Sequence, residues 1–150
     1  MTPTIQLIFA SMSGRNQAIA MHLQSDLAAY AQTVVTEISQ ADAYDLPNAD
    51  AVILVTYTYH DGELPDEAQD FYADLQDVDL NRTKFAVCGS SSKQHVHFGR
   101  AVDYLTMQLN SSNGEQVADS VKIDQEPDDS DLARIDQLAK QVLKSFESEK

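Results

Sequence analysis

The stretch IQLIFASMSGRN, residues 5–16, predicts a buried strand, a polar loop and the start of a helix. Residues Ile5 to Ala10 are almost all apolar, as in a strand packed inside a sheet. From Asn16 onward, apolar residues recur at helical spacing, at Ile19, Leu23, Leu27 and Tyr30. A strand followed by a helix is the repeating unit of parallel α/β sheets.

The same alternation continues along the chain. Four further strands are predicted at Thr33–Ser39, Ala51–Tyr57, Lys84–Gly89 and Val117–Ile123. The first of these alternates and is β-branched, which predicts an edge strand, whereas the second is apolar throughout, which predicts a strand covered on both faces. Helical stripes lie between and after them, at Ala68–Leu75, Ala101–Leu109 and Leu132–Phe146. All four prolines fall outside these elements. We therefore expect a five-stranded, doubly wound parallel sheet with helices on both faces.

Length and charge limit the classes of protein that the chain can represent. The 150 residues predict a single domain, 1–150, with enough apolar side chains for a core. The formal charge of −14 argues against nucleic-acid binding and against an anionic membrane surface, because both need clustered Lys and Arg. A basic protein is the natural electrostatic partner.

Cysteine content and hydropathy predict a soluble, cytoplasmic monomer. Cys88 is the only cysteine in the sequence, which excludes an internal disulfide and a cysteine-based metal cluster. The N-terminal residues lack the pattern of a signal peptide, and no apolar stretch approaches the roughly 20 residues of a membrane span.

An acidic segment precedes the last predicted helix. Five of the eight residues in 124–131 are acidic. We interpret the segment as a solvated connection in which Ser130 or Asp131 caps the following helix, in preference to a binding role.

Ligands of doubly wound sheets bind beyond the carboxyl ends of the strands, where the strand order reverses. The loops after the first, third and fourth strands are therefore the candidate site. The first, Ser11 to Asn16, combines two hydroxyls, a glycine and a helix N-terminus, which suits a phosphate. It lacks both the Walker pattern and the three-glycine dinucleotide pattern, and an ordinary capped turn is the alternative. Four of the five glycines lie in or beside the three loops, at positions 14, 62, 89 and 99.

Taken together, the loops resemble those of the flavodoxins. The resemblance rests on SMSGRN at 11–16, TYHDGELPDE at 58–67, AVCGSSS at 86–92, FGRAVDYL at 98–105 and KID at 122–124. It implies the strand order 2-1-3-4-5 and bound FMN, with the phosphate in the first loop and the isoalloxazine ring between the other two. The short turn at Asn113-Gly114, with no long insertion before the fifth strand, resembles the short-chain members.

The resemblance also implies the cofactor-binding residues. They are Ser11, Met12, Ser13, Gly14, Arg15 and Asn16 in the first loop, Tyr57, Thr58, Tyr59, His60, Asp61 and Gly62 in the second, and Gly89, Ser90, Ser91, Ser92 and His95 in the third.

Five of these positions depart from the usual family pattern. Asn16 replaces a phosphate-binding Thr and can still donate a hydrogen bond. Arg15 replaces Asn, and either contacts the phosphate or points to solvent. Tyr59 takes the place of the inner aromatic residue, often Trp. His60 replaces a glycine whose peptide turns over on reduction, and its side chain should hinder positive φ. His95 falls at the outer stacking position, where it either stacks and titrates near neutral pH or is an ordinary exposed histidine.

Other kinds of site fit the sequence less well. His95 and His97 have i, i+2 spacing, which sends their side chains to opposite sides of an extended loop, so we expect no metal site there. The run Ser90–Ser92 has no G-x-S-x-G elbow, which argues against a hydrolase. We interpret Asp61, Glu63, Asp66 and Glu67 as a solvated acidic rim that lowers the flavin potential.

The sequence therefore predicts an FMN-dependent, low-potential electron carrier without catalytic residues of its own. Its expected partners are basic redox proteins, namely a flavin- or NADPH-linked reductase as donor and an acceptor enzyme, because the chain offers no dinucleotide site. Two alternatives remain open at this point. One is an FMN-dependent small-molecule reductase, and the other is a binding module of the same fold that has lost FMN.

Overall fold

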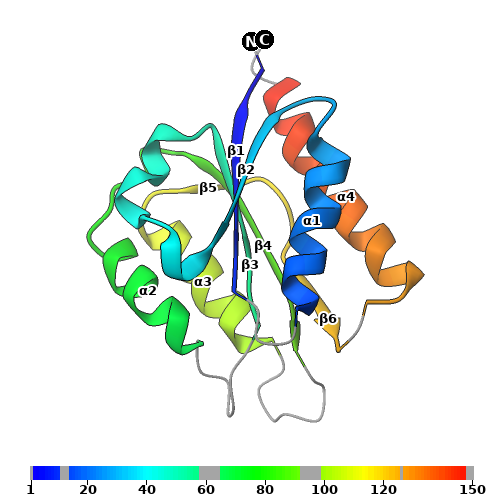
Figure 1. Ribbon diagram of the computed structural model, residues 1–150. Coiled ribbons are helices and arrows are strands. Elements are labelled where there is room, and N and C mark those ends of the chain that lie inside the picture. Colours follow the sequence, from blue (N-terminus) through cyan, green and yellow to red (C-terminus); the bar gives the residue numbers. More distant parts are fainter. Residues whose placement is uncertain (1, 11–13, 58–64, 92–98, 126, 148–150) are drawn as a thin grey trace.

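Figure 1 shows a computed structural model of the chain, which describes residues 2–10, 14–57, 65–91, 99–125 and 127–147. The strands are Thr4–Phe9 (β1), Gln32–Glu37 (β2), Ala51–Val55 (β3), Lys84–Ser91 (β4), Glu115–Gln116 (β5) and Val121–Asp124 (β6). They form one sheet of order β2-β1-β3-β4-β5, with β6 also paired to β4, and every pairing is parallel. The predicted doubly wound sheet and its order are confirmed.

The fifth predicted strand, Val117–Ile123, is wrong in its bounds because the chain there makes two separate segments. Phe85 of β4 pairs with Gln116, but Cys88 pairs with Val121, so the register moves by two residues between them. Two extra residues cannot join a regular ladder, and residues 117–120 therefore leave the sheet. The hydroxyl of Ser120 in this detour bonds the hydroxyl of Thr106, with 2.9 Å between the oxygens.

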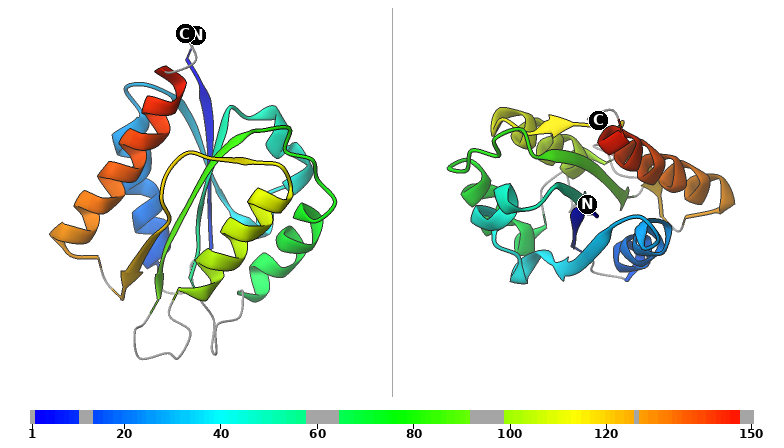
Figure 2. Two further views of the ribbon diagram at one scale, coloured as in Figure 1. Left: turned by 180° about the vertical axis from the view of Figure 1, so that it is seen from behind. Right: turned by 90° about the horizontal axis from the view of Figure 1, so that it is seen from above.

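Within the described residues, four α-helices cover the two faces of the sheet. They are Arg15–Leu27 (α1), Gln69–Leu75 (α2), Arg100–Ser111 (α3) and Asp129–Glu147 (α4), and short 3₁₀ helices occupy Ile38–Gln40, Ala43–Asn48 and Asp66–Ala68. The view from above in Figure 2 shows α1 and α4 on one face and α2 and α3 on the other. Each face has its own apolar core, one built around Leu23 and Leu138 and the other around Phe71 and Leu105. Among the described helices, none is long and apolar enough to cross a membrane.

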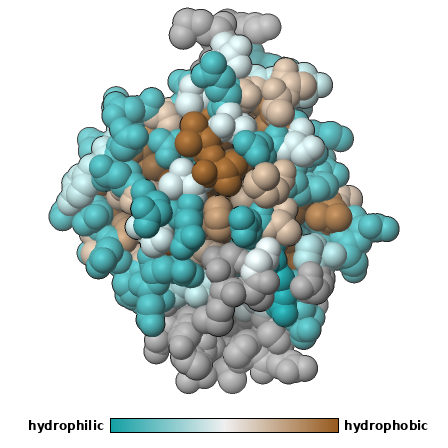
Figure 3. Space-filling view, viewed as in Figure 1, coloured by the Kyte–Doolittle hydropathy of each residue, from teal (hydrophilic) through white to brown (hydrophobic). Residues whose placement is uncertain are grey.

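Strand burial agrees with the hydrophobic patterns. All residues of β3 and β4 are buried, while β2 is partly exposed at the edge of the sheet, as predicted. β2 ends at Glu37, because the buried Ile38 already belongs to a 3₁₀ helix, and β3 ends at Val55, two residues before the predicted end. Figure 3 shows a hydrophobic patch near the middle of the face on which β2 runs in Figure 1. Val34 is an exposed apolar residue of β2.

Two predictions about helix ends are corrected. Tyr30 does not continue the buried stripe of α1, because the helix ends at Leu27 and the Tyr30 side chain is 64% exposed. Neither Ser130 nor Asp131 is the N-cap of α4. The carboxylate of Asp128 accepts from the Asp131 N–H at 2.8 Å, and the carboxylate of Asp131 accepts from the Asp128 N–H at 3.1 Å. This reciprocal pairing is a capping box that begins at Asp128.

Candidate functional site

The carboxyl ends of β1, β3 and β4 meet at the lower edge of the sheet in Figure 1, together with the first turns of α1 and α3. The strand order reverses between β1 and β3, because β2 lies on one side of this pair and β4 on the other. The predicted loops therefore start from one edge at the reversal point, where ligands of such sheets bind.

Helix α1 begins at this edge with a glycine in the left-handed region. Gly14 has φ of 88° and stands at the N-cap, so no side chain at that position competes for the first N–H groups of the helix. The first turn contains no acidic residue. The partial positive charge of the helix N-terminus is therefore not offset by a carboxylate in that turn, which favours an anion.

Asn16 connects the start of α1 to the end of β4. Its Oδ1 accepts hydrogen bonds from the backbone N–H of Ser90 at 3.0 Å and from the Ser90 hydroxyl at 3.2 Å. Both residues are buried, with 2% and 3% of their surface exposed. The acceptor end of the amide is thus committed to Ser90, and the Nδ2 group is the part of Asn16 that remains to donate. The pairing fixes the start of α1 relative to the end of β4.

The ends of β3 and β4 approach each other closely at Gly89. A Cβ atom on Gly89 would lie 1.7 Å from the carbonyl oxygen of Thr56. The N–H of Thr56 also donates to the carbonyl of Cys88 at 3.0 Å. Only glycine permits this contact, so the glycine predicted for the third loop has a packing role between the two strands.

The next residues of β4 and β6 extend the same edge. The Oγ atom of Ser91 is buried and has no hydrogen-bond partner within the part of the chain that the structure describes. The carbonyl of Ser91 accepts from the N–H of Gln125 at 2.6 Å, and Gln125 has a φ of 58°. The sequence analysis did not single out Gln125, and no sequence signal marks a non-glycine residue in this conformation.

Tyr57 follows β3 and contacts the neighbouring 3₁₀ helix. Its hydroxyl donates to Oε1 of Glu67 at 2.9 Å. The sequence interpretation of Glu67 as part of a solvated rim is therefore incomplete, since its carboxylate holds Tyr57, while Asp66 is exposed as expected.

The thiol of Cys88 is not available for chemistry at this edge. Cys88 is fully buried, and burial raises the pKa of its thiol to about 12. It packs with the core beneath α1 and α4.

Ten of the predicted cofactor-binding residues lie outside the described residues. They are Ser11, Met12, Ser13, Thr58, Tyr59, His60, Asp61, Gly62, Ser92 and His95.

Comparison with known proteins identifies the family. A family model described as flavodoxin matches residues 7–144. The chain belongs to the flavodoxin family. It is 32% identical over 146 residues to probable flavodoxin 2 of Bacillus subtilis, covering 93% of this chain and 94% of that protein. A flavodoxin structure from Streptococcus pneumoniae is 36% identical, with a TM-score of 0.91 and coverage of 95% and 99% of the two chains. Human NADPH–cytochrome P450 reductase matches 121 residues at 32% identity, in 18% of its own length.

Membership of the family confirms the central predictions. Flavodoxins are FMN-dependent electron carriers rather than enzymes, so the predicted family, cofactor and electron-transfer role agree with the comparisons. The small-molecule reductase and the binding module without FMN are not favoured.

The described residues of this flavodoxin fit FMN in three respects. In doubly wound sheets, of which flavodoxins are a standard example, the ligand lies at the reversal point described above. The start of α1 at Gly14 suits a phosphate. Gly89 keeps the ends of β3 and β4 close, and Oγ of Ser91, which has no hydrogen-bond partner among the described residues, supplies a buried polar atom at the same edge.

Proposed function

We propose that this flavodoxin carries single electrons at low potential between protein redox partners, with FMN at the carboxyl ends of β1, β3 and β4. The observation that supports this most strongly is the buried pairing of Asn16 with Ser90. It joins the start of α1, where the phosphate is proposed to bind, to β4, which leads into the loop predicted to bind the flavin ring. FMN, when bound, supplies the chemistry of accepting and releasing electrons.

The phosphate would be held by the first loop. Gly14 in the left-handed conformation turns the chain into α1, and the N–H groups of the first turn would donate to the phosphate. Arg15 and the Nδ2 group of Asn16 add donors, and the predicted contacts of Ser11, Met12 and Ser13 belong to the same proposal. These residues bind and orient, and none of them moves a proton.

The isoalloxazine ring would lie between the second and third loops. Tyr57, fixed by Glu67, sets the position from which the second loop leaves β3. Gly89, Ser90 and Ser91 set the corresponding position on β4. Stacking of Tyr59 and His95 on the two faces of the ring, with Thr58, His60, Asp61, Gly62 and Ser92 around it, remains a prediction.

The partners follow from charge. The formal charge of −14 favours basic surfaces on donor and acceptor through long-range attraction. The related human protein is by name an NADPH-linked reductase, and this chain matches only a small part of it. We therefore propose that a separate flavin- or NADPH-linked reductase reduces this flavodoxin, which then reduces an acceptor enzyme. We also propose that the protein is a cytoplasmic monomer and that residues 1–150 form one domain.

FMN titration tests the proposed site. Protein freed of flavin is titrated with FMN, and quenching of flavin fluorescence gives the dissociation constant and the stoichiometry. We expect one FMN per chain at micromolar concentration or below. Gly14→Val should weaken binding at least ten-fold, about 1.4 kcal/mol, because a branched side chain disfavours positive φ.

The control adds the same side chain at the opposite end of α1. Ala29 is exposed and follows the last turn of the helix, so Ala29→Val should leave the FMN dissociation constant unchanged. An unchanged constant in Gly14→Val would place the phosphate elsewhere. Failure of the wild-type protein to bind FMN would contradict the proposal, and rapid turnover with NAD(P)H and quinones would favour a reductase instead.

A further inference from the structure

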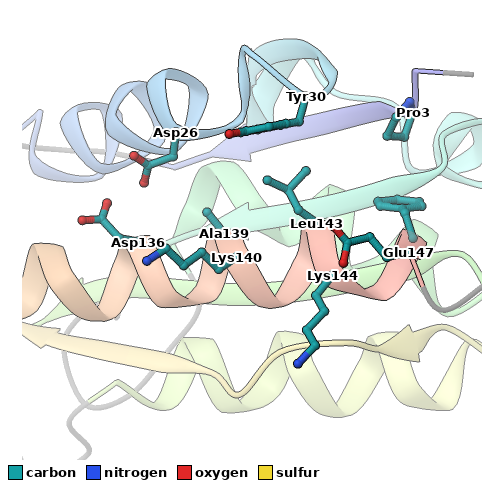
Figure 4. A pocket seen from close by; sticks show the side chains of 10 residues that line it. Pro3, Asp26, Tyr30, Asp136, Ala139, Lys140, Leu143, Lys144 and Glu147 are labelled. Atoms are coloured by element: carbon teal, nitrogen blue, oxygen red, sulfur yellow. The ribbon is translucent and has the colours of Figure 1, made fainter.

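A second cluster of ligand-type side chains lies between α1 and α4. His22 and Asp26 are one helical turn apart on α1, and Asp136 faces them from α4. Nε2 of His22 lies 2.7 Å from Oδ1 of Asp136 and 3.7 Å from Oδ2 of Asp26. One ligand-type atom from each of the three residues lies within 4.8 Å of the others. Figure 4 shows the Asp26 and Asp136 carboxylates pointing toward each other across the gap between the helices.

The electrostatics of this cluster favour a bound cation. Oδ2 of Asp26 is buried and has no hydrogen-bond partner among the described residues. Besides His22, the positive charge of Lys140 also acts on the carboxylates of Asp26 and Asp136. Two carboxylates whose oxygens lie within 4.8 Å of each other repel unless a proton or a cation lies between them. His22 places a nitrogen ligand beside them.

We propose that His22, Asp26 and Asp136 form a binding site for a divalent transition-metal cation of the zinc type. Zinc binds both imidazole nitrogen and carboxylate oxygen, whereas Mg²⁺ and Ca²⁺ prefer oxygen ligands alone. Tetrahedral zinc with ligand bonds of about 2.0–2.1 Å separates its ligand atoms by about 3.3 Å. The two separations from Nε2 of His22, 2.7 and 3.7 Å, bracket this value, and all three ligand atoms lie within 4.8 Å of one another, so side-chain rotations can direct them to a common centre.

The surroundings leave room for the metal and for water. All three side chains are partly exposed, at 33% for His22, 29% for Asp26 and 42% for Asp136. Asp26 and Asp136 also line a groove of about 720 Å³ between the helices, which gives an entry path. The fourth position is therefore taken by water. A metal here would join α1 to α4 and so stabilise the folded chain against unfolding.

Zinc titration of the full chain tests this proposal, with and without FMN. Isothermal titration calorimetry with ZnCl₂ should give one site per chain. His22→Gln and Asp136→Asn should each raise the dissociation constant at least ten-fold. Zinc should also raise the thermal midpoint of the wild-type protein and leave that of His22→Gln unchanged. His97→Asn is the matched control, since it removes a histidine from a different part of the sequence and should bind zinc as the wild type does.

Cobalt gives a readout that does not depend on the folding of variants. Co²⁺ bound by the wild-type chain should show the visible absorption of a four-coordinate site, and zinc should displace it. Absence of zinc binding by the wild type would overturn the proposal, as would binding that survives His22→Gln or is lost in His97→Asn. None of these outcomes depends on whether FMN binds at the other edge.

Discussion

Replacement of Asn16 by alanine should destabilise the protein by about 2–3 kcal/mol. The change removes the acceptor of two hydrogen bonds from Ser90, at 3.0 and 3.2 Å, in a place where both residues are almost fully buried. A lost hydrogen bond costs about 1 kcal/mol net, and a buried donor left without a partner costs about 1–3 kcal/mol. The backbone N–H of Ser90 becomes such a donor, because alanine offers nothing in place of Oδ1.

Urea unfolding of the FMN-free protein measures this cost without any contribution from flavin binding. Asn48→Ala is the matched control. Asn48 is exposed and donates to the exposed Asp45 at 2.9 Å, so its loss should cost less than about 0.5 kcal/mol. If Asn16→Ala and Asn48→Ala unfold at the same urea concentration, the Asn16–Ser90 pairing does not hold the two loops together.

Asn16→Asp separates the structural role from the binding role. Aspartate keeps an oxygen for Ser90, so this variant should be more stable than Asn16→Ala. Its negative charge lies at the start of α1, where the phosphate is proposed to bind, and FMN affinity should fall at least ten-fold, about 1.4 kcal/mol. Equal FMN affinity in Asn16→Asp and wild type would remove Asn16 from the phosphate site.

Further predictions concern Gly89, Cys88 and the net charge. Gly89→Ala should cost about 3 kcal/mol or more in urea unfolding, because its Cβ would overlap the Thr56 carbonyl, and a cost below about 1 kcal/mol would show that β3 and β4 separate easily. Cys88 should react with a thiol reagent at pH 8 only as fast as the chain unfolds, since burial raises its pKa from 9.0 to about 12, and rapid labelling of the native protein would contradict this. Because the native state favours the neutral thiol, Cys88 contributes stability that is complete below pH 9 and lost as the pH rises toward 12. Electron transfer to a basic haem protein should slow as salt is added, because salt screens the attraction between charges that are more than about 8–10 Å apart. A rate constant that does not change with salt would show that the charge of −14 serves solubility and does not attract partners.

Much of the fold could be predicted because the buried strands carry continuous apolar runs. β3 and β4 follow this rule, and their order in the sheet follows from the family resemblance. The division of the last strand could not be predicted, since Val117 and Ala118 are apolar enough to continue a strand. Only the register of Phe85 and Cys88 against their partners shows that two residues are in excess.

The candidate site was predictable in its place but not in its internal contacts. Gly14 and Gly89 were identified from the scarcity of glycine, and the structure gives each a separate physical reason, positive φ in one case and close packing in the other. The sequence suggested that Asn16 donates to phosphate, but its acceptor atom is directed to Ser90, 74 positions away. Contacts between residues so distant in sequence leave no local pattern. The same holds for His22 and Asp136, which are 114 positions apart.

The position of β4 has a consequence for how the protein opens. β4 is buried along its whole length and is paired on both sides, with β3 on one and with β5 and β6 on the other. Backbone amides in such a strand exchange with deuterium only in the rarest and largest fluctuations, whereas those of the edge strand β2 exchange in local ones. The third loop of the site leaves from this central strand, and Asn16 attaches the first turn of α1 to it. The edge that is proposed to hold FMN is therefore built on strands whose opening needs large fluctuations, so the smaller fluctuations that admit or release the flavin need not unfold its support.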